Sequence, residues 1–399
     1  MATPDLDPEK QPDREPGQVR VRVLIVDDSA LMRRLLSDLL SSAPEIEIVG
    51  TARDGREAVL QAARLKPDVI TLDVEMPEVS GLEALPAILA VHPVPVVMVS
   101  ALTQEGADVT LQALELGAVD FMAKPERNQL AEMRASRDLL VGKVLAAAQS
   151  RVRRPRRTAS SSSTSSSTTS SSTKGVTSRS PTRPPSLSAT PPPIPASASS
   201  PLCFVIGIST GGPQALSQVF PLLVPPLPPI LVVQHMPAQF TGIFAERLNR
   251  YSTVPIKQAE EGDQVLPDRI LIAPGGRHMV LIGHPPRVRI GLLDQPPVSG
   301  HRPSIDVLFQ SAARAYQSAT IGLLMTGMGR DGVEGCKAIL AAHGFTLGQD
   351  EGTSVVYGMN KAAFLEGAIK AQFALDELPH IIQNISALRA ELESPASSD

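Results

Sequence analysis

Apolar runs and amphipathic stretches alternate along the first third of the chain. The runs have the length and β-branched content of strands, and the stretches between them repeat apolar positions at helical spacing. Strands are expected at residues 21–26, 46–50, 68–73, 94–100 and 118–122. Helices are expected at residues 56–65, 81–91 and 106–116, after a first helix with Leu31, Leu35, Leu36 and Leu39 on one face. This order predicts a doubly wound parallel sheet.

A second alternating region begins near residue 202 and continues almost to the end. Its strands are expected at residues 204–208, 229–233, 254–259, 269–273, 320–325 and 345–349. Two further runs, 279–282 and 288–292, have the spacing of a hairpin. Helices are expected at residues 240–250, 304–316 and 333–343, with one more from about residue 375. The region therefore predicts a second parallel-sheet domain.

The composition changes abruptly between the two regions. Residues 159–173 are almost entirely serine and threonine, and residues 190–201 are rich in proline, alanine and serine. Such a segment cannot bury a core and is expected to be disordered. The expected division is a disordered N-terminal extension at 1–19, an α/β domain at 20–145, a disordered linker at 146–200, an α/β domain at 201–392 and a disordered tail at 393–399.

Charge and cysteine content narrow the classes of function. A net charge of -4 and an aromatic content of 3% disfavour nucleic acid as a partner. The two cysteines form no disulfide or metal-binding pattern, which fits a reducing, cytoplasmic location. No apolar run reaches the roughly 18 residues of a membrane span, so direct membrane insertion is not expected.

Polar residues follow the strands of the first region where these strands end. They are Asp27, Asp28, Asp73, Ser100 and Lys124. Parallel strands bring such residues to one edge of a sheet, where converging carboxylates need a cation and suit Mg²⁺. A carboxylate beside Mg²⁺ can attack a phosphoryl group. Each acid taken singly is more often a solvated turn residue or a helix cap, so the prediction depends on the whole set.

These residues resemble the receiver domain of two-component response regulators. The resemblance rests on Asp27-Asp28, Asp73, Met76-Pro77, Ser100 and Lys124-Pro125. It implies that a chemotaxis-type histidine kinase phosphorylates Asp73. It also implies that Asp28, Asp73 and the carbonyl of Glu75 hold Mg²⁺ with help from Asp27. Ser100 and Lys124 would sense the phosphoryl group, and Phe121 matches an aromatic switch position.

Ser209, His235 and Asp331 follow three strands of the second region. If these strands are adjacent and parallel, the three side chains share one edge and could act as nucleophile, general base and orienting carboxylate. The glycine-rich segment 326–331 could offer backbone amides to an oxyanion. Other interpretations remain: Ser209 in an ordinary turn or a phosphate-binding loop, Asp331 as the cap of the following helix, or Cys336 as a rival nucleophile. Cys203 is expected away from this edge.

Five motifs of the second region resemble the catalytic domain of chemotaxis protein-glutamate methylesterases, the CheB family. They are the segments 207–213, 234–237, 273–275, 301–306 and 326–332. The resemblance implies hydrolysis of glutamate methyl esters on chemoreceptors with release of methanol, and deamidation of certain receptor glutamines. It places Ser209, His235 and Asp331 on the catalytic triad, Met328 on the oxyanion position through its backbone amide, and Thr210 beside the nucleophile.

Together the resemblances imply a flavodoxin-like receiver and a Rossmann-like α/β methylesterase joined by the linker. The unphosphorylated receiver would cover the catalytic edge until Asp73 is phosphorylated. Ester hydrolysis would need no cofactor, the protein would be a monomer, and its partners would be chemoreceptors and the kinase. The alternative is a phosphorylation-switched, receptor-binding regulator with little or no hydrolase activity. His278 and His301 are expected in loops, where they could line a pocket.

Overall fold

The computed structural model describes residues 20–101, 103–124, 130–150 and 202–393. The expected N-terminal extension, most of the linker, Pro125 and most of the tail lie outside these residues. Both α/β domains belong to one compact unit. No helix in the described ranges combines the length and apolarity that a membrane crossing requires.

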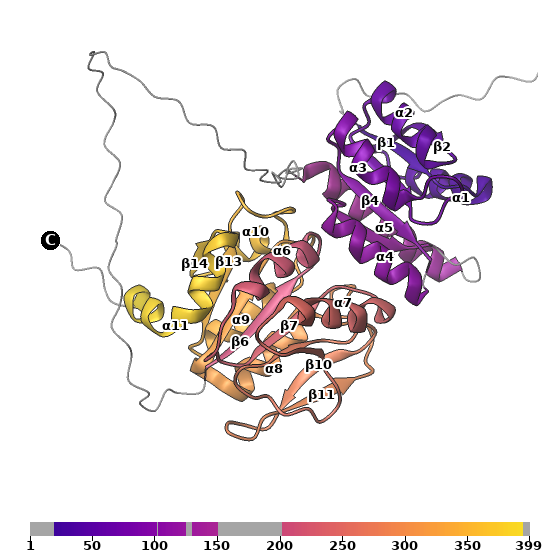
Figure 1. Cartoon of the computed structure of the whole chain (residues 1–399). Coiled ribbons are helices and arrows are strands. Elements are labelled where there is room, and N and C mark those ends of the chain that lie inside the picture. Colours follow the sequence, from indigo (N-terminus) through magenta and orange to yellow (C-terminus); the bar gives the residue numbers. More distant parts are fainter. Residues whose placement is uncertain (1–19, 102, 125–129, 151–201, 394–399) are drawn as a thin grey trace, which may run out of the picture. The chain divides into compact units, whose positions relative to one another are not determined.

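The first domain is a five-stranded parallel sheet with strand order β2-β1-β3-β4-β5 (Figure 1). Its strands are β1 (Val21–Val26), β2 (Ile46–Ala52), β3 (Val69–Asp73), β4 (Val96–Ser100) and β5 (Asp120–Ala123). This is the flavodoxin-like order, in which the order of strand addition reverses between β1 and β3. Residues that follow β1 and β3 therefore meet at one crevice.

Five helices connect and follow these strands. They are α1 (Ala30–Ser41), α2 (Gly55–Leu65), α3 (Gly81–Val91), α4 (Gln104–Glu115) and α5 (Leu130–Gln149). Of the four leucines expected on one face of α1, Leu36 and Leu39 are buried together with Leu40, whereas Leu31 is 54% exposed. Leu36, Leu39 and Leu40 form one stripe at helical spacing, and each helical residue turns the side chain by about 100°, which carries Leu31 off that stripe.

Gly81 allows the first turn of α3 to lie directly against the end of β3. A Cβ built on Gly81 would lie 1.9 Å from the backbone oxygen of Asp73. We expect Gly81→Ala to lower the stability of the first domain by about 1–3 kcal/mol, because the helix must move away from the strand. Urea unfolding of the full chain, followed by a probe in this domain, would show an earlier transition.

Gly242→Ala is the matched control for this prediction. Gly242 lies inside α7 (Ala238–Tyr251), and the nearest atom to its added Cβ is 3.5 Å away. Alanine is the better helix former, so this change should be neutral or slightly stabilising. An unchanged urea midpoint for Gly81→Ala would contradict the close packing of α3 on β3.

The second domain is a seven-stranded parallel sheet with strand order β14-β13-β12-β6-β7-β9-β8. Its strands are β6 (Cys203–Ile208), β7 (Ile230–Gln234), β8 (Ile256–Gln258), β9 (Ile270–Ile272), β12 (Thr320–Leu324), β13 (Phe345–Gln349) and β14 (Ala371–Phe373). The expected hairpin is present as an antiparallel pair, β10 (His278–Ile282) with β11 (Arg289–Leu293). The chain runs from β6 to β7 on one side and from β12 to β13 on the other. The switch point of the sheet therefore lies between β6 and β12.

Helices cover both faces of this sheet (Figure 1). They are α6 (Gly212–Val219), α7, α8 (Ile305–Tyr316), α9 (Val333–Ala341), α10 (Met359–Leu365) and α11 (Leu378–Glu393), with short 3₁₀ turns at Phe220–Leu222, Gln317–Ala319 and Leu375–Glu377. Phe204 and Ile206 of β6 pack into the apolar cluster that includes side chains of α6, α7 and α11. Val205 packs into the cluster that includes α8 and α9. Burial on both faces explains the continuous apolar runs of the central strands.

Candidate active site

The three residues predicted to share an edge do follow adjacent parallel strands. Ser209 follows β6, His235 follows β7, and Asp331 lies in the loop after β12. β6 is the central strand of the three, paired with β12 on one side and with β7 on the other. The carboxyl ends of these strands therefore place the three residues at the switch point of the sheet.

The turn at Ser209 is held by backbone and side-chain contacts from both neighbouring strands. The Ser209 amide donates to the backbone oxygen of Thr326 at 3.0 Å, and Gln234 Nε2 donates to the backbone oxygen of Ser209 at 3.0 Å. Gly211 has a φ of 80°, and a Cβ there would meet the side chain of Val355. The serine is thereby fixed immediately before the N-terminus of α6.

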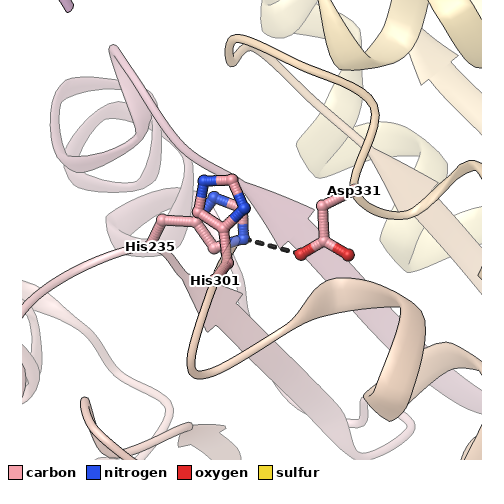
Figure 2. A group of neighbouring side chains, drawn as sticks. All are labelled: His235, His301 and Asp331. Atoms are coloured by element: carbon pink, nitrogen blue, oxygen red, sulfur yellow. Dashed lines mark hydrogen bonds and ion pairs between the residues drawn. The ribbon is translucent and has the colours of Figure 1, made fainter. Parts of the chain in front are cut away.

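His235 is oriented by a hydrogen bond to a buried carboxylate (Figure 2). Its Nε2 lies 2.8 Å from Asp331 Oδ2. An ionised carboxylate only accepts, so Nε2 carries the proton and Nδ1 carries the lone pair. Nδ1 is buried and has no hydrogen-bond partner among the described residues. This tautomer leaves Nδ1 available as a base.

The Ser209 hydroxyl and His235 Nδ1 are not hydrogen-bonded to each other in this structure. Within the described residues, the Ser209 hydroxyl forms no hydrogen bond. His235 Nδ1 has no partner there either. Such bonds are often long in free enzymes and tighten when substrate binds. The arrangement supplies a fixed serine, an oriented base and a buried carboxylate, which are the three groups that acyl transfer by a serine requires.

Asp331 accepts hydrogen bonds from the first turn of α8 as well as from His235. Oδ1 accepts from Ser304 Oγ at 2.8 Å and from the Asp306 amide at 3.1 Å, and Oδ2 accepts from the Ile305 amide at 2.7 Å. Although burial raises the pKa of Asp331, the bond to His235 and the bonds from the Ile305 and Asp306 amides lower it below its ordinary value. The carboxylate therefore remains ionised at neutral pH.

Asp331 does cap a helix, but not the one that follows it. The helix after Asp331 is α9, whose N-cap is Gly332. Its first amides are bonded instead by Asp306, whose Oδ1 accepts from Gly332 at 2.9 Å and from Gly335 at 2.7 Å. Burial raises the pKa of the Asp306 carboxyl. The N-termini of α8 and α9 thus exchange caps, and Asp331 can serve both α8 and His235.

His301 lies with its ring against the ring of His235 (Figure 2). The ring centroids are 3.8 Å apart and the planes differ by 9°. Ligand atoms of His235, His301 and Asp331 lie within 4.8 Å of one another. An imidazole binds a metal in the plane of its own ring. Two parallel rings direct their nitrogen lone pairs along separate planes, so this cluster does not fit a metal centre.

The glycine-rich loop after β12 passes beside Ser209. Thr326 is fixed at its start, since its amide donates to Gln349 Oε1 at 3.0 Å and its hydroxyl donates to the backbone oxygen of Thr210 at 2.9 Å. The side chain of Met328 is 42% exposed. Gly327 has room only for a hydrogen, because a Cβ there would lie 2.6 Å from Ser209 Cβ. The loop backbone therefore comes close to the serine, as an oxyanion site requires.

A second group of charged side chains converges at the crevice of the first sheet. Ligand atoms of Asp27, Asp28 and Asp73 lie within 4.8 Å of one another. Lys124 Nζ lies 2.7 Å from Asp73 Oδ2 and 3.1 Å from Asp27 Oδ2. Burial, with a contribution from Asp27, raises the pKa of Asp73 to about 6 in spite of Lys124. One lysine does not balance three carboxylates, and their oxygens fit Mg²⁺.

The other predicted receiver residues lie around this crevice. The Ser100 hydroxyl donates to the backbone oxygens of Ala101 and Gly106, and not to Asp73. The Glu75 amide donates weakly to Asp73 Oδ1 at 3.4 Å, which places residue 75 beside that carboxylate. Phe121 is buried, and its ring centroid lies 4.4 Å from that of Phe240 in α7.

Side chains of β5 and α5 contact the neighbourhood of Ser209. Thr210 Oγ1 donates to Asp120 Oδ2 at 2.5 Å, and Lys143 Nζ lies 2.7 Å from the same oxygen. A Cβ on Gly142 would lie 2.9 Å from Met328 Cε, so α5 also touches the loop after β12. Thr210, predicted to support the nucleophile, is therefore engaged by the first domain.

Several open alternatives lose their basis in the structure. Cys203 and Cys336 are both fully buried, and burial raises the pKa of each thiol. Neither fits an accessible thiolate nucleophile. His278 is buried too; its Nε2 lies 3.0 Å from the backbone oxygen of Pro296, and Nδ1 accepts from the Ser304 amide at 3.1 Å. His278 therefore holds the turn before α8, and the expectation that it lies in a loop was wrong, because it is the first residue of β10 and is fully buried.

Sequence reasoning assigned no orienting role to Ser304, Asp306, His301 or Gln234, although all four lie in motifs that it quoted and His301 was expected to line a pocket. Their functions depend on partners far along the chain, such as the bond from Ser304 to Asp331. The one available signal was the presence of several polar residues in the segment 301–306, in front of an apolar helix. A serine followed by an acid in that position predicts only a helix start.

Comparisons with known proteins match both halves of the chain. Residues 204–382 match the family described as CheB methylesterase, and residues 23–135 match the response regulator receiver domain. A protein-glutamate methylesterase/protein-glutamine glutaminase of Pyrococcus horikoshii is 40% identical over 364 residues, which are 91% of this chain and 93% of the relative. One from the group 3 operon of Rhodopseudomonas palustris is 42% identical over 380 residues, which are 95% and 99% of the two chains. The crystal structure of the Thermotoga maritima CheB methylesterase catalytic domain is 36% identical, with a TM-score of 0.46, and covers 47% of this chain and 100% of that domain.

Proposed function

The chain belongs to the CheB methylesterase family with an N-terminal response-regulator receiver domain, and we propose a serine mechanism under phosphorylation control for it. It is a protein-glutamate methylesterase and protein-glutamine glutaminase. The finer proposal is that it hydrolyses glutamate γ-methyl esters of chemoreceptors to release methanol and deamidates specific receptor glutamines. This reaction would reset receptor sensitivity during adaptation.

In the proposed reaction, the Ser209 hydroxyl attacks the ester carbonyl while its proton passes to His235 Nδ1. The negative charge on the carbonyl oxygen is stabilised by backbone amides near Met328. The tetrahedral intermediate collapses, and His235 returns the proton to the departing methoxide as methanol. Water then attacks the acyl-serine, with His235 again taking and returning one proton, and the receptor glutamate is released. With a glutamine side chain, the leaving group is ammonia.

The observation that carries this mechanism is the orientation of His235. Asp331 holds Nε2–H at 2.8 Å, and the opposite nitrogen is left as an unpaired base at the sheet edge that Ser209 shares. A histidine that served only structure would be expected to satisfy both ring nitrogens when buried. The carboxylate also favours the imidazolium that forms during attack.

The receiver is proposed to control this site through Asp73. Asp28, Asp73 and the carbonyl of Glu75 would hold Mg²⁺, with Asp27 assisting. Bound Mg²⁺ would neutralise charge while a phosphoryl group is transferred from a histidine kinase. Lys124 already contacts Asp73 at 2.7 Å, and it would contact the phosphoryl oxygens once Asp73 is modified. Ser100 would turn from its present carbonyl partners toward the same group.

Inhibition in the unphosphorylated state is proposed to act through the contacts near Ser209. The bond between Thr210 and Asp120 and the contact between Gly142 and Met328 support this proposal. Both contacts involve residues adjoining the proposed nucleophile and oxyanion site. Rearrangement of β5 and α5 after phosphorylation would break them and admit a receptor helix.

The remaining parts of the proposal concern the chain as a whole. The expected boundary at residue 145 falls inside α5, which continues to Gln149, and α11 ends at Glu393. We propose that the receiver spans residues 20–149 and the catalytic domain residues 201–393, between an N-terminal extension (1–19) and a C-terminal tail (394–399). The linker between the two domains is long, but the cost of closing a flexible loop grows slowly with its length. Docking of the two domains can therefore persist in a monomer. The reaction would occur in the cytoplasm, where the kinase and the receptor methylation helices meet.

The test is methanol release from chemoreceptor membranes that carry labelled methyl esters. Wild type and Asp73→Asn would each be assayed with Mg²⁺, in the presence and absence of a small phosphodonor. We expect the phosphodonor to raise the wild-type rate by about 5–150-fold, the range that a coupling energy of 1–3 kcal/mol supplies. Asp73→Asn should stay at the basal rate when the phosphodonor is added, because asparagine cannot form the acyl phosphate.

Asp54→Asn is the matched control, since Asp54 caps α2 and lies outside the crevice. It should respond to the phosphodonor as wild type does. Release of no methanol from several receptor types would overturn the proposed ester substrate. Release that ignores the phosphodonor, while Asp73 is demonstrably phosphorylated, would overturn the proposed control.

A further inference from the structure

His301 is presented to His235 by a tight turn. Val298 and His301 exchange backbone hydrogen bonds of 3.1 and 2.9 Å, and the two residues between them, Ser299 and Gly300, have φ values of 52° and 80°. Positive φ at both central residues is the signature of a two-residue type I′ hairpin turn. The ring is held as well, because His301 Nδ1 lies 2.8 Å from the backbone oxygen of Ser299. The side chain is therefore fixed before any substrate arrives.

The ring of His235 is restrained less completely without this neighbour. Its single hydrogen bond, from Nε2 to Asp331, fixes one atom of the ring but not the tilt of the ring plane about that bond. Nδ1 has no partner that would fix the plane from the other side. The parallel ring of His301, 3.8 Å away, supplies a flat surface that sets the plane (Figure 2).

We propose that His301 is a positioning residue for the esterase and glutaminase reaction, which sets the plane of the His235 ring by stacking so that Nδ1 faces Ser209. The inference rests on the proposed serine mechanism. It gives a role to the start of the 301–306 segment, whose later residues Ser304 and Asp306 bond to Asp331 through a hydroxyl and an amide. One continuous segment would then orient both partners of the serine.

The charge state of His301 agrees with stacking. Burial, followed by the neighbouring His235, lowers the pKa of His301 to about 4, although Asp331 opposes the shift and Lys143 contributes to it. His301 is therefore neutral at neutral pH. A neutral ring can lie against the imidazolium that His235 becomes during attack, whereas a second cation there would oppose it.

The geometry argues against His301 as the base itself. The nitrogen nearest its own turn, Nδ1, is bonded to Ser299. Within the described chain, neither ring nitrogen of His301 is hydrogen-bonded to a carboxylate, whereas His235 is bonded to Asp331. The stacking face of the ring, rather than its nitrogens, is the part that His235 contacts.

The test compares His301→Ala with His301→Phe in the full-length protein. Phenylalanine keeps a flat ring and loses both nitrogens, whereas alanine loses the ring. We expect His301→Ala to lower kcat by about tenfold, which corresponds to ~1.4 kcal/mol, with KM nearly unchanged. His301→Phe should recover kcat to within about threefold of wild type, because stacking is retained.

A second readout does not depend on turnover. The proton on His235 Nε2, bonded to buried Asp331, should give a downfield proton NMR signal that stays visible in wild type and His301→Phe. In His301→Ala the ring can tilt and water can reach the bond, so this proton should exchange faster and its signal should broaden or vanish. An inactive wild type with this pattern intact would count against the proposed reaction and not against the stacking.

His284→Ala is the matched control. His284 follows the hairpin strand β10 and contacts the backbone oxygen of Ala315 at 3.3 Å, outside the site. It should change neither kcat nor the NMR signal. Equal loss of activity in His301→Ala and His301→Phe, with folding intact by thermal melting, would show that the nitrogens matter and would overturn the proposal. Wild-type kcat in both variants would overturn it as well.

Discussion

Ser209→Ala is expected to reduce methanol release by about 10⁵–10⁶-fold, to the level that binding and oxyanion contacts alone provide. The hydroxyl is the attacking group in the proposed mechanism, and no other described side chain at this edge is fit to replace it. The two thiols of the chain are buried, and burial raises their pKa. The rate should stay low with and without the phosphodonor, because exposure of the site cannot replace the missing nucleophile.

The same substitution should leave stability almost unchanged. Ser209 is held by its backbone, through the amide bond to Thr326 and the carbonyl bond from Gln234, and both survive in alanine. The hydroxyl itself has no partner in the described structure that would be left unpaired, so a change within about ±0.5 kcal/mol in the free energy of unfolding is expected. Urea unfolding and phosphorylation of Asp73 would confirm that both domains are intact.

Ser217→Ala in α6 is the matched control and should be fully active. Methanol release by Ser209→Ala above about a thousandth of the wild-type rate would move the attack to another group or to water, since removal of a triad nucleophile costs far more than this. Complete loss of receptor binding in the same variant would instead indicate that Ser209 serves recognition.

The positions of the reactive residues could be predicted from sequence because the ends of the strands can be recognised where apolar runs stop. Apolar runs ended at Ser209, His235 and Asp73, and parallel pairing then required that residues after adjacent strands meet at one edge. In the second sheet, the structure places the strands that precede Ser209, His235 and Asp331 side by side, with β6 between β12 and β7. The same reasoning predicted the order of most elements and the bounds of most helices, but it placed no helix at α5, which spans Leu130–Gln149 and continues past the expected domain boundary at residue 145.

Short elements at the rim of the second sheet could not be predicted in this way. α10 has only seven residues and β14 only three, too few to show a period. β14 is an edge strand whose place depends on pairing with β13, from Leu347 to Gln349. Tertiary contact, rather than local pattern, therefore determines both elements.

The exchanged caps of α8 and α9 and the stacked rings of His235 and His301 could not be predicted from the sequence for a different reason. The hydrogen bond from Gly332 to Asp306 and the stacking of His301 on His235 join residues that are distant in sequence. A lone histidine or aspartate before a helix carries no sign of its partner. The sequence predicted which residues could react, whereas the residues that orient them required coordinates.

Asp331→Asn is expected to lower kcat by about 10⁴-fold with little change in KM, the effect seen when a triad carboxylate becomes an amide. Asp331 receives donors at both oxygens: Ser304 Oγ and the Asp306 amide at Oδ1, and His235 Nε2–H and the Ile305 amide at Oδ2. An asparagine amide has one oxygen and one NH₂ group, so either orientation sets NH₂ against donors. If NH₂ faces His235, the imidazole shifts its proton to Nδ1 and the base that Ser209 needs is lost.

The alternative orientation turns NH₂ toward Ser304 and the Asp306 amide. It keeps an oxygen acceptor for His235, so kcat should fall less, whereas stability should fall in both orientations because either the Ile305 or the Asp306 amide loses its acceptor. A buried amide donor would then be unpaired, with a penalty of about 1–3 kcal/mol in the free energy of unfolding. The two outcomes can be separated by measuring kcat and urea unfolding on the same variant, with Asp350→Asn, in the loop after β13, as the control outside the site. Asp331→Asn with more than a tenth of wild-type kcat would show that His235 does not need a charged partner, and the proposed triad would then reduce to Ser209 and His235 alone.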